Sequence, residues 1–183
     1  MKNIVYVATS LDGFIAREDG ELDWLTGFPN PGNSDYGFAE FMAGIDAVLM
    51  GRRTFETVLG FGEWPYSKPV FVLSSTLTGV PERLKGKAEV VNGPLTGILS
   101  SLEARGIRRL YVDGGKTIQS FLREDLVDEM TLSIIPVVLG SGFPLFERMN
   151  RQLRILIKSA AVLYQFGHYS DEFGHVQKLA ALG

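Results

Sequence analysis

Two short segments that combine glycine with basic residues are the parts of this chain best suited to hold a charged ligand. Residues 50–55 (MGRRTF) and 111–117 (YVDGGKT) each follow an apolar run and each open a segment with a helical pattern. The N-terminus of a helix carries unpaired backbone N–H groups and a partial positive charge, so a glycine turn that leads into one can seat a phosphate. The pair therefore predicts two phosphate-holding turns.

The basic residues of the two segments indicate what kind of phosphate they would hold. Arg52, Arg53 and Lys116 add full positive charges. Arginine forks suit a terminal phosphate, whereas a diphosphate is usually held by backbone amides and helix dipoles. Together the turns predict a phosphorylated dinucleotide, with Arg52 and Arg53 near its extra phosphate. The alternative is that each glycine only turns the chain between a strand and a helix.

An alternation of strands and helices has to position these turns. Short β-rich apolar runs occur at 4–8, 47–50, 70–73, 89–91, 110–112 and 130–138. Helical patterns lie between them at 36–43, 54–59, 94–104 and 117–122. Continuous apolar strands belong inside a sheet that is covered on both faces, and the alternation indicates an α/β layered fold.

The C-terminal third has a different pattern. Residues 153–164 and 174–179 predict a long antiparallel hairpin joined by the polar loop 167–172, which would close one edge of the sheet. The longest irregular stretch is 26–34, rich in Pro, Gly and Asn, and it is either an active-site lid or a simple surface loop.

Composition sets limits on organisation and partners. A chain of 183 residues fits one domain, which we expect to span 1–183. A net charge of −3 with scattered basic residues argues against nucleic-acid binding. With no cysteine and only two histidines, His168 and His175, we expect no metal site. The N-terminus is unlike a signal peptide and no run is long enough to span a membrane, so we expect a cytoplasmic protein without membrane contact.

The order of several motifs resembles a known superfamily. The dinucleotide fingerprint G-x-G-x-x-G is absent, so a Rossmann fold is unsupported. The motifs are 10–16 (SLDGFIA), 23–25 (DWL), 50–54 (MGRRT), 72–75 (VLSS) and 113–116 (DGGK). In this order they resemble the dihydrofolate reductase superfamily, in particular the branch related to the reductase domain of the riboflavin-biosynthesis deaminase-reductase. The resemblance runs from Ile4 to about Phe146.

This resemblance implies a fold and a cofactor. The fold is a dihydrofolate-reductase-like three-layer α/β arrangement with a mixed, mainly parallel central sheet and an antiparallel C-terminal hairpin. NADPH would bind across the carboxyl ends of the strands. The nicotinamide carboxamide would be held by backbone groups of Ala8 and Ile15. Ser74 and Ser75 would help to bind the 2′-phosphate.

The remaining cofactor contacts that the resemblance implies belong to the two glycine turns. The first turn, on the adenosine side and the diphosphate, consists of Gly51, Arg52, Arg53 and Thr54. The second diphosphate turn consists of Gly114, Gly115, Lys116, Thr117 and Ile118. In relatives the peptide between the paired glycines is commonly cis.

Three further residues are of interest beside the cofactor set. Asp35 matches the acid that binds the pterin in folate reductases, and it is a candidate catalytic residue and substrate anchor, with a raised pKa if it lies in an apolar pocket. Alternatively, Asp35 caps the helix that follows it. Trp24 is a candidate substrate contact beside the nicotinamide. Asp113 departs from the folate-enzyme pattern, and we expect it to cap the next helix instead of facing a diphosphate.

The function that the resemblance implies is reduction by hydride transfer, which needs no protein nucleophile. We expect an NADPH-dependent oxidoreductase acting on a small heterocyclic substrate, most similar to 5-amino-6-(5-phosphoribosylamino)uracil reductase of riboflavin biosynthesis. The alternatives are a dihydrofolate or pterin reductase and a non-catalytic NADPH-binding paralogue. A homodimer through 130–138 and the terminal hairpin is also expected.

Overall fold

The computed structural model describes residues 1–30, 32–148 and 152. Apart from the last of these, the described residues belong to one compact unit, Met1–Met149. The predicted hairpin over 153–164 and 174–179 lies outside the described residues, as do His168 and His175. The single domain over 1–183 stays a prediction.

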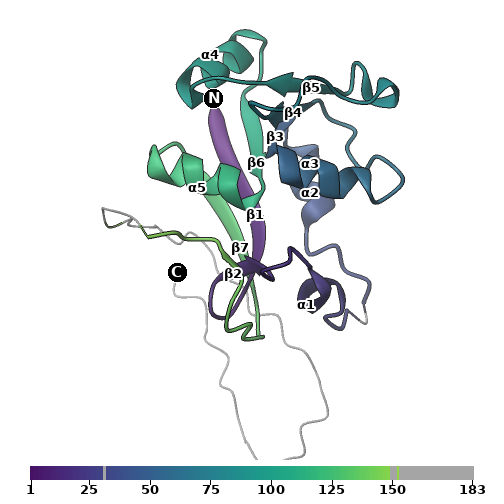
Figure 1. Ribbon diagram of the computed structural model, residues 1–183, viewed down its shortest axis with the longest axis vertical. Helices are drawn as coiled ribbons and strands as arrows, with labels where there is room; N and C mark the ends of the chain where they lie inside the picture. The colour runs from purple at the N-terminus through teal and green to yellow at the C-terminus, as the bar shows by residue number, and fades with distance from the viewer. Residues whose placement is uncertain (31, 149–151, 153–183) are drawn as a thin grey trace, which may run out of the picture. The chain divides into compact units, whose positions relative to one another are not determined.

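A six-stranded sheet forms the centre of this unit, in the order β5-β4-β3-β6-β1-β7 (Figure 1). All neighbouring strands in it run parallel. The strands are β1 (Lys2–Ser10), β3 (Ala47–Gly51), β4 (Val70–Leu73), β5 (Ala88–Val91), β6 (Arg109–Asp113) and β7 (Glu129–Ile135). Because all six are parallel, their carboxyl ends lie along one edge of the sheet.

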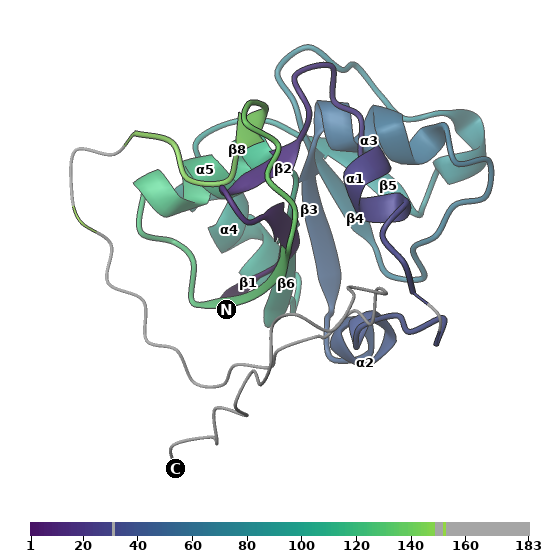
Figure 2. The ribbon, with the colours of Figure 1, turned by 90° about the horizontal axis from the view of Figure 1, so that it is seen from below.

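Helices cover both faces of this sheet, as the sequence predicts. Figure 2 shows α2 (Phe38–Ala43) and α3 (Arg52–Leu59) on one side, and α4 (Leu95–Ala104) and α5 (Gly115–Arg123) on the other. The three-layer α/β fold is therefore confirmed. The smaller elements are the short helix α1 (Asp23–Thr26), the 3₁₀ helix η1 (Glu82–Leu84) and a two-stranded antiparallel sheet of β2 (Phe14–Ala16) and β8 (Phe143–Pro144).

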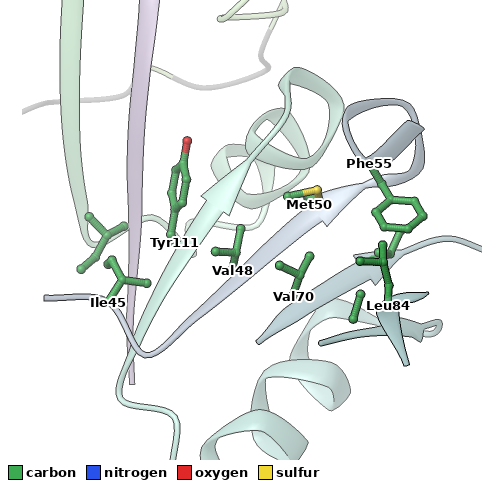
Figure 3. Packing of buried hydrophobic residues seen from close by; sticks show 10 residues of the cluster. Ile45, Val48, Met50, Phe55, Val70, Leu84 and Tyr111 are labelled. Atoms are coloured by element: carbon green, nitrogen blue, oxygen red, sulfur yellow. The ribbon is translucent and has the colours of Figure 1, made fainter. Parts of the chain in front are cut away.

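The core forms where the central strands are apolar on both faces. Val48, Met50 and Val70 point to the face on which α3 packs, and Figure 3 shows them with Phe55 of that helix. All four side chains are at most 1% exposed. Burying each side chain of this size contributes about 1.5–3 kcal/mol, so this packing stabilises β3, which leads directly into the first glycine turn.

Some element boundaries differ from those predicted, for local backbone reasons. The helix predicted over 36–43 begins at Phe38, because Tyr36 and Gly37 take left-handed φ angles of 56° and 89°. The strand predicted over 130–138 ends at Ile135, because Pro136 has no N–H to continue the ladder. Sequence reasoning missed β2 and β8, which are too short to show a periodic pattern.

Candidate functional site

The two glycine turns lie side by side at the carboxyl edge of the sheet. Strands β3 and β6 are neighbours, with Met50 paired to Asp113, so the turns that follow them are adjacent. A Cβ placed on Gly114 would be 3.7 Å from the backbone nitrogen of Gly51. Helix α3 begins at Arg52, within the first turn, and α5 begins at Gly115, within the second. The structure thus brings together two motifs that are more than sixty residues apart in the sequence.

The turns also interlock so closely that side chains are excluded at their glycines. A Cβ on Gly51 would lie 2.8 Å from Thr117 Oγ1, and one on Gly114 would collide with Thr54 Oγ1. Gly114 in addition has a φ of 89°, which favours glycine. Each turn therefore packs against the threonine of the other one.

A third segment, β2, closes over the second turn. A Cβ on Gly115 would collide with Ile15 Cδ1, so this glycine leaves room for the β2 side chain. Ala8 lies in β1, between β6 and β7, and is partly buried. The residues predicted for the nicotinamide and for the second diphosphate turn thus belong to adjoining elements.

Both helices present backbone N–H groups that no side chain caps. The residues before them, Gly51 and Gly114, have no side chain that could accept such a bond, and within the described part of the chain no side-chain cap bond is formed. Neighbouring N-termini of this kind attract an anion through their dipoles and their free donors. The two N-termini together form a candidate anion-binding site.

Ile118 and the glycine peptide differ from the expectations that the resemblance carried. Ile118 is fully buried and its N–H donates to Gly114 O at 2.9 Å, so the residue serves the core and the start of α5. The described residues contain no cis peptide bond, so the expectation of a cis Gly114–Gly115 peptide is wrong. The turn is instead formed with φ 89° and ψ 133° at Gly114.

The predicted cations are exposed and differ in their partners. Arg52 lies 3.5 Å from Glu56 one turn along α3, while Lys116 lies 3.6 Å from Glu147. Among the described residues, none forms an ion pair or hydrogen bond with the Arg53 guanidinium. Exposed pairs of this kind are weak, about 0.2–1 kcal/mol, so all three side chains remain free to turn towards a ligand.

The two serines predicted for the 2′-phosphate have different environments. Ser74 is buried, and its Oγ accepts the N–H groups of Thr76 and Leu77 at 3.2 and 2.9 Å. It therefore shapes the loop after β4. Ser75 is exposed, so its hydroxyl is the better placed of the two to meet a ligand in solvent.

Asp35 does not have the environment expected of a buried substrate anchor. Its carboxylate accepts the N–H groups of Gly37 at 3.0 Å and Ala39 at 2.8 Å, so it caps α2. These backbone hydrogen bonds, that from Ala39 foremost, lower the pKa of Asp35. The expected raised pKa is wrong because the side chain is exposed and stabilised as an anion; the capping alternative is confirmed. Its role towards a substrate stays a prediction.

Asp113 does not cap α5, contrary to expectation. Its Oδ1 accepts the N–H of the next residue, Gly114, at 2.8 Å, which lies before α5, and among the described residues no side chain caps α5. Its Oδ2 faces the Tyr66 hydroxyl at 3.4 Å. Burial raises the pKa of Asp113, because desolvation outweighs the hydrogen bonds that favour the carboxylate. The side chain turns to the sheet face and to a tyrosine from the loop before β4.

A polar row of tyrosines links the surroundings of Asp113 and Asp35. The Tyr111 hydroxyl donates to Tyr6 O at 3.1 Å, and the Tyr6 hydroxyl donates to Tyr36 O at 2.6 Å. Burial raises the pKa of Tyr6, and the nearby charge of Asp35 adds to this.

This row is covered by the aromatic side of α2. Phe41 stacks on Tyr6 with ring centroids 4.7 Å apart and meets Tyr111 edge-on at 5.0 Å. Sequence reasoning missed these tyrosines; the signal available was that Tyr111 stands two residues before Asp113 on one strand, and so shares its face.

Trp24 is buried in α1, 6% exposed, and its Nε1 has no hydrogen-bond partner among the residues that the structure describes. A buried indole N–H without a partner costs free energy, so a polar group that reached it would be favoured. Its predicted contact with a substrate stays a prediction.

Asp12 anchors the loop beside β2. Its carboxylate accepts the Ser10 hydroxyl at 2.7 Å and the N–H groups of Leu139 and Gly140 at 3.1 and 2.7 Å. These bonds, that of Ser10 foremost, lower the pKa of Asp12 to about 2. The residue stands in the turn before Gly13, and it also joins this turn to the distant loop of Leu139 and Gly140.

Comparison with known proteins identifies the family of the chain. The profile of the RibD C-terminal domain matches residues 2–164. YwjB of Bacillus subtilis (strain 168), itself uncharacterised, is 34% identical over 91% of this chain and 92% of its own. A Shewanella sp. PV-4 protein, provisionally named for riboflavin biosynthesis, is 49% identical over 89% of this chain and 93% of its own, with a TM-score of 0.85.

A more distant structure shares the fold. The diaminohydroxyphosphoribosylaminopyrimidine deaminase/5-amino-6-(5-phosphoribosylamino)uracil reductase of Thermotoga maritima is 20% identical, with a TM-score of 0.61. This match covers 91% of the present chain but 53% of the Thermotoga one. Within the part of the chain that the structure describes, no helix is long and apolar enough to cross a membrane, and no group of three or more His, Asp or Glu side chains could hold a metal ion.

Proposed function

The chain belongs to the RibD C-terminal domain family, and on this premise we propose that it is an NADPH-dependent reductase that transfers hydride to a small heterocyclic substrate. The first candidate substrate is 5-amino-6-(5-phosphoribosylamino)uracil, whose reductase is named in the Thermotoga relative. The observation that carries the proposal is the interlocked pair of glycine turns at the ends of β3 and β6.

The residues present fit such a cofactor. Two uncapped helix N-termini face the same edge, and three glycines keep side chains out of the space beside them. A diphosphate would accept hydrogen bonds from these N–H groups, while Arg52 and Arg53 would hold the 2′-phosphate with Ser75. Bound there, the reduced nicotinamide supplies the hydride.

The protein's own part is to position the reactants. Backbone groups of Ala8 and Ile15 would orient the carboxamide, so that one face of the nicotinamide is turned towards the substrate. Packing of Ile15 on the second turn would keep water from the reacting atoms. Asp35, as an anion, would accept a hydrogen bond from a substrate N–H, because a carboxylate that already accepts two bonds still has lone pairs free.

A turnover assay tests this function. The full chain is mixed with NADPH and either 5-amino-6-(5-phosphoribosylamino)uracil or dihydrofolate, and loss of NADPH absorbance is followed with product mass. We expect NADPH consumption with the pyrimidine. Consumption with dihydrofolate alone would reassign the substrate class to pterins. NADPH binding without consumption of either compound would indicate a non-catalytic paralogue.

Two further expectations stay proposals. In the segment predicted to pair two copies, Ile134 and Val138 are 58% and 65% exposed, which supports a homodimer contact through β7. A monomeric mass in solution would refute it. The second expectation that stays a proposal is a cytoplasmic location.

A further inference from the structure

Resting on the proposed function, we propose that Tyr36 determines which substrates this chain takes. Its ring stacks on a planar heterocycle, while the carboxylate of the preceding residue, Asp35, accepts hydrogen bonds from amino or ring N–H groups of the same molecule. The two residues are consecutive in the chain and stand shortly before α2. The ligand is therefore defined by two features together, a flat ring and N–H donors along its edge.

The backbone of Tyr36 has a conformation that a large side chain rarely adopts. Its φ is 56°, in the left-handed region. The structure describes two other non-glycine residues with a positive φ, Asn33 and Asp125, and both are of types that tolerate it. A bulky residue in this region is an outlier, and such outliers gather at active sites and ligand clamps, where the surrounding structure holds them. A tyrosine at this position therefore indicates that its ring is needed, because glycine would fit the backbone better.

Hydrogen bonds on both sides hold Tyr36 in this conformation. Its N–H donates to Ser34 Oγ at 3.0 Å, and its carbonyl accepts the Tyr6 hydroxyl at 2.6 Å. Ser34 is held in turn by the Asn30 side chain, which accepts its N–H at 3.0 Å and donates to its carbonyl at 2.7 Å. The backbone is thus fixed from the loop before it and from β1, so the point at which the ring is attached is preorganised.

The ring of Tyr36, unlike its backbone, is available to a ligand. Tyr36 is 42% exposed. In the described part of the chain its hydroxyl forms no hydrogen bond and its ring packs on no other aromatic ring, whereas the nearby rings of Phe38 and Phe41 pack on Tyr6 and Tyr111. Those four rings form the support beneath. An aromatic face of this kind stacks on flat heterocycles.

The Asp35 carboxylate supplies the second feature of the site. It accepts the backbone N–H groups of Gly37 and Ala39 at 3.0 and 2.8 Å, and it has lone pairs left for a ligand donor. The same two bonds lower the pKa of Asp35, so the group is an anion at neutral pH. An anion accepts hydrogen bonds from N–H groups and repels carbonyl oxygens. The site therefore favours heterocycles that present donors at their edge.

The proposed position of the nicotinamide lies close to Tyr36. Tyr6, which donates to the Tyr36 carbonyl, stands two residues before Ala8 on β1. Both side chains are on one face of the sheet, about 6.5 Å apart along the strand. Since Ala8 is proposed to orient the carboxamide, a heterocycle stacked on Tyr36 would lie beside the hydride donor.

Binding without turnover tests the stacking. The full chain with ring-labelled tyrosine is saturated with NADP⁺ and titrated with 5-amino-6-(5-phosphoribosylamino)uracil or, separately, with dihydrofolate. NMR follows the Tyr36 ring signals, which are assigned by their loss in Tyr36→Phe. We expect these signals to move upfield and to saturate, because a heterocycle that stacks on a ring shields the protons of that ring.

Three variants separate the ring from the backbone. Tyr36→Gly removes the ring but suits a φ of 56°, so the fold should be retained while the dissociation constant of the bound heterocycle rises about tenfold or more. Tyr36→Phe keeps the ring and should stay within about twofold of the wild type. Asn33→Gly is the matched control, because it introduces a glycine at another positive φ, 44°, in the same loop, and it should leave the dissociation constant unchanged.

The outcomes separate this proposal from the proposed function. Wild-type affinity in Tyr36→Gly, or Tyr36 signals that do not move on binding, would overturn the role of Tyr36 even in an active enzyme. An equal loss of affinity in Asn33→Gly would overturn it too, since the loop backbone would then be responsible. A wild type that binds the heterocycle on Tyr36 but never oxidises NADPH would overturn the proposed function and leave the stacking supported. A wild type that binds neither compound would overturn both.

Discussion

The two glycine turns share one plan, strand to glycine to helix, yet they differ in what surrounds them. The first has an ordinary backbone at Gly51, with φ −76°, and two exposed arginines directly after it. The second has φ 89° at Gly114, packs against Thr54 and Ile15, and is preceded by a half-buried acid, Asp113. The first turn therefore offers positive charge to a ligand, whereas the second has a constrained, closely packed backbone. Substitutions in the two turns should consequently have different effects.

The largest effect is expected at the second turn. Gly114→Ala has to adopt an unfavourable φ and collides with Thr54 Oγ1, which together should lower the free energy of unfolding by about 3 kcal/mol or more. Chemical denaturation measures this. Gly106→Ala is the matched control, because Gly106 also has a positive φ, 90°, but a Cβ built there has no atom within 4 Å. The stability that Gly106→Ala loses therefore measures backbone strain alone. An equal loss of unfolding free energy in both variants would show that the collision with Thr54 does not contribute to the effect.

The contact between the turns gives the next largest effect. Gly51→Ala brings a Cβ to 2.8 Å from Thr117 Oγ1, and we expect a loss of about 1–3 kcal/mol in stability together with weaker NADPH binding. The double variant Gly51→Ala with Thr117→Ala removes the clashing oxygen and should regain part of both. A double variant whose losses are simply additive would mean that the two turns are not coupled through this contact.

Charge at the first turn should affect affinity instead of stability. Arg52→Ala with Arg53→Ala should weaken NADPH binding by about 30-fold or more, since each charged hydrogen bond contributes about 1.5–3 kcal/mol, and should leave NADH binding nearly unchanged. Isothermal titration of both dinucleotides measures the ratio. Lys116→Ala, on the second turn, is the control and should change the ratio little. An equal loss for both dinucleotides would place the arginines at the diphosphate.

The smallest effect concerns the loop that supports β2. Because the pKa of Asp12 is lowered to about 2, its contribution to stability is present above the ordinary value of 3.8 and is lost as pH falls towards 2. The stability difference between the wild type and Asp12→Asn should thus be constant above about pH 5 and shrink below it. Denaturation at several pH values measures this; a difference that persists at pH 2 would show that the charge is not responsible.

The positions of the turns followed from the sequence, whereas the environments of the acids did not. Glycines, basic residues and a preceding apolar run are local signals, and they located residues 50–55 and 111–117 correctly at two helix starts. The charge state of an acid depends on partners brought by the fold. Tyr66 is 47 residues from Asp113 in the chain, and nothing in the sequence around either residue indicates their contact. Asp35 was ambiguous for the same reason, because capping and burial share one sequence pattern.

The most direct test of the central claim is a fluorescence titration of the purified chain with NADPH and, in parallel, with NADH. The account predicts saturable NADPH binding and NADH binding that is at least about tenfold weaker, since only NADPH offers the arginines a 2′-phosphate. Binding of neither dinucleotide would contradict the account.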